Sequence, residues 1–184
     1  MKKGTLYLTQ TAIMLAILIV VQLITRGFGQ FVTGSLVNFI LLATVYLVGL
    51  GGGLTVALLS NFLAFFIGVG PGFIQVVPFV AVANAIFVLI GWLVRKPIMT
   101  PGVRDTPLTA AGLIAASVAK MAFLWVGLVL IALPLFSGFN EKQIAAITAA
   151  FTWPQLVTAL IGSALAILLV PLLRRALARR GENG

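Results

Sequence analysis

The sequence contains no histidine and no cysteine, and only three of its 184 residues are acidic. These acids, Asp105, Glu141 and Glu182, lie in predicted loops or in the C-terminal tail. Hydrolysis in a membrane needs a base, a nucleophile pair or a metal, and metal ligands are mainly His, Cys and carboxylates. Proton-driven transport commonly uses Asp, Glu or His inside the spans. The sequence therefore disfavours an enzyme, a metal site and a proton-coupled carrier, and we expect no cofactor.

A phosphate-binding loop of the Gly-x-x-x-x-Gly-Lys-Ser/Thr type is also missing, so the chain cannot bind ATP in that way. If the protein moves a solute uphill, a partner must supply the energy. The net charge of +9 does not indicate nucleic-acid binding, because the basic residues form short clusters between apolar runs. Clusters of that kind set the orientation of membrane proteins.

Apolar residues dominate what is present. Hydrophobic residues make up 61% of the chain, charged residues 8%, and the mean hydropathy is +1.21. A soluble domain of this size does not have such a composition. We predict an all-α integral membrane protein with a single membrane domain, residues 1–184.

Six apolar stretches are long enough, or nearly so, to cross a hydrocarbon core of roughly 30 Å. A helix through 36–68 would be too long to cross once and would carry four glycines at its centre, so we predict a tight turn there. Both termini are predicted to be cytoplasmic, because most basic residues then lie inside. The outer loops are then 26–35, 69–75 and 136–153, the last with a short helix capped by Asn140. The predicted spans are 5–25, 36–50, 53–68, 76–94, 108–135 and 154–173.

Lys120 is the single charge in the stretch 106–140. A charge at the centre of a bilayer costs roughly 2.5–3.5 kcal/mol on insertion scales. At 1.5 Å per residue from Leu108, this lysine lies about 18 Å deep. Its amine, charged or deprotonated, could bond amides or backbone carbonyls of neighbouring helices, or as a cation it could pair with a carboxylate or phosphate of a ligand. We favour the ligand, and expect Lys120→Gln to weaken binding.

Neutral polar side chains also occur within the spans or at their outer ends. Amides donate and accept hydrogen bonds, which suits a polar organic ligand. The alternatives are hydrogen bonds between helices for the amides, and an interfacial anchor for the tryptophan. The predicted substrate-binding residues are Lys120, Asn38, Asn84, Gln75, Trp153, Gln155, Asn61 and Gln30.

Two small residues, Ala12 and Ala16, share one face of the first predicted helix. Small residues at this spacing let helices approach closely in lipid, although packing within the protein would explain them too. With these residues, six spans and no energy source, the whole chain resembles a substrate-binding S-component of an energy-coupling factor (ECF) vitamin transporter. The runs 34–38 (GSLVN) and 153–158 (WPQLVT) are similar to stretches in one branch of that family.

The resemblance implies a multi-pass protein of a bacterial or archaeal cytoplasmic membrane. It implies that Ala12 and Ala16 dock onto a transmembrane coupling subunit that two ATPase subunits drive. It also implies a vitamin-like ligand bound toward the outer face, below the loops that follow the first, third and fifth helices. Lys120 favours an acid, such as a pantothenate-, folate- or nicotinate-like compound. A stand-alone facilitator or channel and a non-transport membrane scaffold remain as alternatives.

Overall fold

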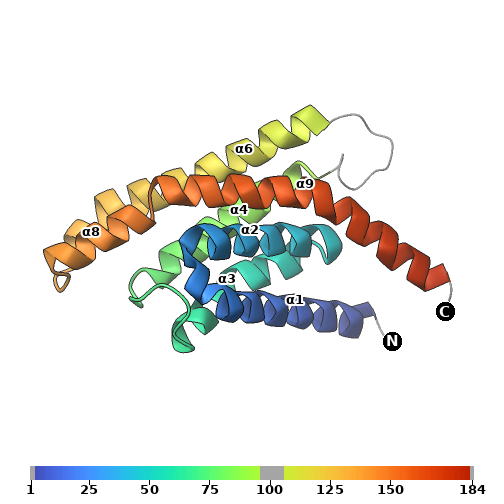
Figure 1. Cartoon of the computed structure of the whole chain (residues 1–184), viewed down its shortest axis with the longest axis horizontal. Coiled ribbons are helices and arrows are strands. Elements are labelled where there is room, and N and C mark those ends of the chain that lie inside the picture. The colour runs from blue at the N-terminus through green and yellow to red at the C-terminus, as the bar shows by residue number, and fades with distance from the viewer. Residues whose placement is uncertain (1–2, 96–105, 183–184) are drawn as a thin grey trace.

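The computed structural model describes residues 3–95 and 106–182; no strand occurs among them, and the all-α fold is confirmed. Asp105 lies outside the described residues. Figure 1 shows α1 beginning and α9 ending at the same end of the molecule. The elements are α1 (Lys3–Thr25), the 3-10 turn η1 (Arg26–Phe28), α2 (Gly29–Leu47), α3 (Leu50–Phe66), α4 (Val77–Leu93), α6 (Thr106–Phe123), the π-helix η2 (Leu124–Ala132), α7 (Leu133–Leu135), α8 (Glu141–Ala150) and α9 (Trp153–Glu182).

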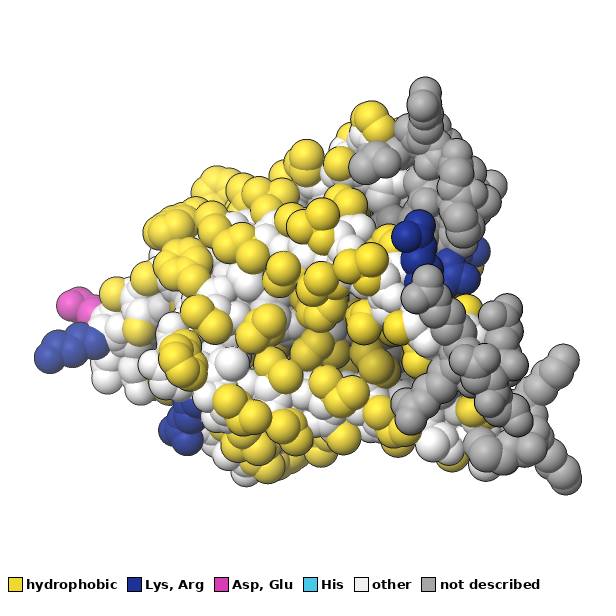
Figure 2. All heavy atoms as spheres, turned by 45° about the vertical axis from the view of Figure 1, so that its right-hand side comes forward, with side chains coloured by type: hydrophobic (Ala, Val, Ile, Leu, Met, Phe, Trp, Pro, Cys, Tyr) yellow, Lys and Arg dark blue, Asp and Glu magenta, His cyan; other side chains and the backbone are white. Residues whose placement is uncertain are grey.

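Three helical stretches in the described residues are long and apolar enough to cross a membrane: Gly4–Leu47, Pro107–Leu135 and Glu141–Ala178. The apolar helices α3 and α4 are shorter. The first stretch consists of α1, η1 and α2, and α1 and α2 lie side by side in Figure 1. Apolar side chains also cover much of the face in Figure 2, as expected where lipid replaces water. These features are those of a multi-pass membrane protein; the count of six spans and the side of the termini remain predictions.

The predicted outer loop 26–35 is wrong, because these residues form η1 and the start of α2. α2 begins at Gly29, seven residues before the predicted span. η1 forms a corner between α1 and α2. Thr33 stabilises this corner, because its Oγ1 donates a 2.8 Å hydrogen bond to the carbonyl of Thr25. Gly34 lies within the helix and makes room for α9, since a Cβ there would lie 3.0 Å from Cγ2 of Thr158. The glycines in this segment therefore reflect a corner and a close helix contact.

The other turns agree better with the sequence. Gly49, with φ +114°, forms the predicted tight turn between α2 and α3. Asn140 caps α8 as predicted. Its Oδ1 accepts a hydrogen bond from the backbone N–H of Gln143 at 2.9 Å, and Gln143 Oε1 accepts one from the backbone N–H of Asn140 at 3.0 Å. The last helix continues to Glu182, nine residues beyond the predicted span.

Two apolar clusters enclose the middle of the bundle. The first lies around α2 and includes Leu41, Leu42 and Val45. The second joins α4, η2 and α8, and includes Val80 and Leu128. α2 packs most extensively on α9 and also contacts α1, α3 and α4. Because α2 is central, its side chains can reach residues of most other helices.

η2 is a π-helix that begins four residues after Lys120. Buried residues recur at exact intervals of four through α6 and η2. In an α-helix each such step drifts by about 40° around the axis, so the row would turn away from the core. The wider π turn keeps the row facing inward, a feature often found at functional sites. The row is Ala116, Lys120, Leu124, Leu128 and Ala132.

Candidate binding site

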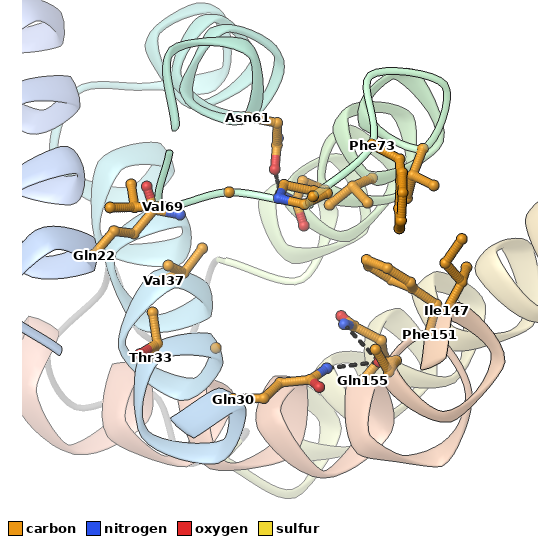
Figure 3. A pocket seen from close by; sticks show the side chains of 18 of the residues that line it. Gln22, Gln30, Thr33, Val37, Asn61, Val69, Phe73, Ile147, Phe151 and Gln155 are labelled. Atoms are coloured by element: carbon orange, nitrogen blue, oxygen red, sulfur yellow. Dashed lines mark hydrogen bonds between the residues drawn. The ribbon is translucent and has the colours of Figure 1, made fainter. Parts of the chain in front are cut away.

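A cavity of about 400 Å³ lies between the two apolar clusters, within the range of roughly 300–1,000 Å³ usual for ligand pockets. Three segments at one end of the bundle contribute to it: η1 with the start of α2, the loop 69–73, and the C-terminal half of α8 with Phe151. Figure 3 shows Phe73 and Phe151 on one wall, with Gln22 and Thr33 on another. The cavity thus lies next to the segments that follow α1, α3 and α7.

Lys120 lines this cavity and is only 2% exposed. Its Nζ donates a 2.6 Å hydrogen bond to Asn38 Oδ1 and lies 5.5 Å from the ring centroid of Phe87. Asn38 Nδ2 in turn donates to Thr158 Oγ1 at 3.4 Å, and Thr158 Oγ1 donates to the Gln155 carbonyl at 3.2 Å. This chain of bonds fixes the Asn38 oxygen toward the lysine. An ammonium group has three donors, and this hydrogen bond to Asn38 uses one of them.

Asn61 and Asn84 form a second hydrogen-bonded pair on the cavity wall. Asn61 Nδ2 donates to the Ala57 carbonyl at 2.7 Å, and Asn61 Oδ1 accepts from Asn84 Nδ2 at 3.3 Å. Asn84 is 2% exposed, and its Oδ1 has no partner among the described residues. A buried polar atom without a partner is costly, and such atoms are often explained by a ligand or water.

Gln30 and Gln155 also line the cavity, and both hold the end of α8. Their Nε2 atoms donate to the same carbonyl, that of Ala150, at 2.6 Å and 3.2 Å (Figure 3). The last carbonyls of a helix lack partners inside the helix, so side-chain donors stabilise them. These amides therefore connect α8 to α2 and α9 along one edge of the cavity.

The two remaining predicted residues, Gln75 and Trp153, are exposed and do not line the cavity. Trp153 is 61% exposed, and its ring lies 5.6 Å from that of Phe31. This position fits the alternative interpretation of Trp153 as an interfacial anchor.

Several lining residues were not predicted from the sequence. Arg26 is not among the predicted residues, yet it lines the cavity together with Gln22, Phe73 and Phe151. Arg26 and Lys120 are the cationic residues of the described lining, and that lining includes no acidic residue. The run 70–73 (Gly-Pro-Gly-Phe), a tight loop ending in an aromatic residue, was the available signal for this wall. The electrostatics of the cavity therefore favour an anion.

Ala12 and Ala16 lie elsewhere, on an exposed face of α1. Leu18, Gln22 and Thr25 of the same helix are buried against the bundle. α1 packs on α2 and α3 with that buried side, so the two alanines are accessible to another transmembrane helix.

Among residues 3–95 and 106–182, no group of three His, Cys, Asp or Glu side chains could hold a metal ion. The cavity offers cationic donors, amides and aromatic rings, which can bind a small organic molecule.

Comparison with known proteins gives one match. A family model described as "ECF transporter, substrate-specific component" matches residues 6–174. No curated protein and no solved structure matches the chain. Because the family model covers nearly the whole length, the chain belongs to the substrate-specific components of ECF transporters.

Proposed function

We propose that this protein captures a small vitamin-like organic acid from outside the cell in the cavity around Lys120. One observation carries the proposal: a buried lysine with donors to spare lines a cavity whose described lining includes no carboxylate. The substrate-specific component of an ECF importer binds its substrate and is not an enzyme, so the site has only to bind the substrate and release it. A carboxylate is the group that best satisfies the remaining donors of Lys120.

The energetic argument depends on how costly the lysine is without a ligand. A charge in a bilayer is unfavourable by several kcal/mol, and a single neutral amide offsets only part of this. Hydrogen bonds that involve a charged group contribute about 1.5–3 kcal/mol each. Hydrogen bonds with Nζ therefore stabilise a bound carboxylate strongly. The same hydrogen bonds offset the cost of removing the carboxylate from water. Arg26, at the η1 corner, adds attraction for an anion.

The energy for uptake would come from a transmembrane coupling subunit and two ATPase subunits. The exposed Ala12 and Ala16 face of α1 is the proposed docking surface, since small residues permit close helix approach. The basic ends of the chain would then be cytoplasmic, and the protein would lie in a bacterial or archaeal cytoplasmic membrane.

The test of capture begins with the small molecule that the purified protein retains, identified by mass spectrometry. Its affinity is then measured by calorimetry for wild type, Lys120→Gln and Lys142→Gln. Lys142 is an exposed lysine of α8 that does not line the cavity, so it is a matched control for loss of a charge. We expect at least about a tenfold loss for Lys120→Gln and no change for the control. Equal affinity in the two variants would exclude Lys120 as the anion partner.

The test of docking uses the double variant Ala12→Trp, Ala16→Trp. Uptake in proteoliposomes that contain the coupling and ATPase subunits should be lost, while binding by the isolated protein is retained. The matched control is Ile13→Trp, Ile17→Trp, with the same spacing on an exposed face about 100° away around the helix. Equal uptake by both double variants would remove the docking surface. Flux without ATP through this chain alone would favour a facilitator, and absence of saturable binding would favour a scaffold.

A further inference from the structure

We infer that the bound acid also carries an N–H or O–H donor, a few bonds from its carboxylate, that is received by Asn84. This inference rests on the proposed function and defines the substrate class more narrowly. The evidence is that buried polar atoms of the cavity wall lack hydrogen-bond partners. Of the three buried side-chain atoms without a partner in the described residues, two belong to cavity-lining residues, Asn84 Oδ1 and Gln22 Oε1, and the third is Ser163 Oγ.

The orientation of the Asn84 amide follows from its neighbours. The Ala57 carbonyl can only accept, so it must face the Asn61 nitrogen, which leaves the Asn61 oxygen toward Asn84. That oxygen can only accept as well, so Asn84 must present its nitrogen to it. The free atom of Asn84 is then an oxygen, an acceptor that only a donor can satisfy. A carboxylate or an aromatic ring cannot do so.

The position of this acceptor relative to Lys120 comes from α4. Lys120 Nζ lies 5.5 Å from the ring centroid of Phe87, and Asn84 precedes Phe87 by three residues on the same helix face. α4 begins next to the loop 69–73 that lines the cavity, so Asn84 lies about 4.5 Å nearer that loop along the axis than Phe87 does. A ligand with its carboxylate at Lys120 therefore places its donor roughly one helical turn outward.

The Asn84 oxygen is recessed in the wall, so the donor reaches it as neighbouring side chains adjust to the ligand. Adjustments of this size are common on binding. Sites built to bond an O–H or N–H reject analogues that lack it, because the buried partner is then left unsatisfied. Asn84 thus acts as a specificity-determining residue, distinct from the charge pairing by Lys120.

The experiment offers the purified protein an equimolar mixture of pantothenate, folate, nicotinate and panthenol, and identifies the retained compound by mass spectrometry. Pantothenate and folate have both a carboxylate and N–H donors. Nicotinate has the carboxylate without such a donor, and panthenol has the donors without the carboxylate. The mixture is also offered to Asn84→Leu and to Ser163→Ala, which removes the unpartnered buried oxygen that does not line the cavity. Thermal unfolding checks that each variant is folded.

We expect wild type to retain pantothenate or folate over nicotinate by at least about tenfold. Asn84→Leu should reduce this preference about tenfold, and Ser163→Ala should leave it unchanged. Retention of nicotinate, or an unchanged preference in folded Asn84→Leu, overturns this inference while the capture of an acid stands. Retention of panthenol, or of none of the four, counts against both proposals. If Asn84→Leu does not fold, the preference of wild type alone decides between these outcomes.

Discussion

The two halves of the helix bundle differ sharply although the same helices build both. In the cavity half, α2 and α4 present Asn38 and Asn84 to an open space. One turn further along, the same helices present Leu42 and Val88 to a filled core, which we name the closed half. There even a glycine is packed: a Cβ on Gly91 would lie 2.6 Å from Leu42 Cδ2. The cavity thus occurs where amides occupy a few positions and the side chains stop short of filling the centre.

The difference between the halves also defines what each tolerates. The closed half depends on shape, because apolar packing drives association where lipid is the solvent. The cavity half depends on partners, because each buried polar atom must be satisfied. In the cavity half, a substitution that removes one member of a hydrogen-bonded pair should therefore lower the free energy of unfolding more than a double substitution that removes both members.

The largest effect is expected at the Lys120–Asn38 pair. Asn38→Leu removes the only hydrogen-bond acceptor shown for the buried ammonium among the described residues, and we expect a loss of about 2–4 kcal/mol in the free energy of unfolding. The double variant Asn38→Leu, Lys120→Met removes both hydrogen-bond partners and places apolar side chains at both positions, as in the closed half. It should recover more than about 1 kcal/mol of the loss, as denaturation in detergent micelles would show. A double variant no more stable than Asn38→Leu would contradict the comparison.

The next effect concerns the packing of α9 on α2. A Cβ on Gly162 would lie 2.6 Å from Asn38 Cβ and 2.8 Å from the backbone nitrogen of Phe39, and backbone cannot yield as a side chain can. Gly162→Ala should therefore lower the free energy of unfolding by about 1–3 kcal/mol. The control is Gly27→Ala, where nothing lies within 4 Å of the added Cβ. Equal melting temperatures for the two variants would mean that α9 can move away from α2 freely.

A smaller and local effect is expected at the cap of α8. Asn140→Ala removes the acceptor for the Gln143 amide and should cost about 1 kcal/mol of helix stability. Because α8 supplies Ile147 and Ala150 to the cavity, hydrogen exchange should become faster there while the closed half stays protected. Asn140→Asp keeps the cap and serves as the control. Exchange that rises equally in both halves would show that α8 is not an independent unit.

Much of the fold could be predicted from the apolar runs alone. The tight turn at Gly49 and the cap at Asn140 followed from the conformational freedom of glycine and from the hydrogen bonds of an N-cap. The start of α2 could not be predicted, because glycines indicate a loop and a close helix contact equally well. Only the approach of Thr158 to Gly34 decides between these.

The lining of the cavity was predicted only in part for a similar reason. Buried Lys120 and the asparagines were conspicuous because polar residues are rare in these spans. Gln75 has the same amide group and Trp153 has an indole donor, but both are exposed and do not line the cavity, since periodicity does not tell which side of a helix end faces the centre. Arg26 was missed because a charge at a span boundary ordinarily reports orientation. The π-helix that keeps the Lys120 row inward has no simple sequence signal.

The smallest effect is expected for a substitution of Arg26. Its effect on affinity can be compared with that of Lys120, the other cationic residue that lines the cavity. Arg26 is exposed at the η1 corner whereas Lys120 is buried, so salt screens the arginine far more strongly. Arg26→Gln should lower the affinity for the retained acid only about two- to fivefold, mainly through slower association. The association rate of wild type should fall as ionic strength rises, and that of the variant should fall less, in stopped-flow measurements. If the dissociation rate changes instead, Arg26 contacts the bound acid directly, and the anion site extends from Lys120 to the η1 corner.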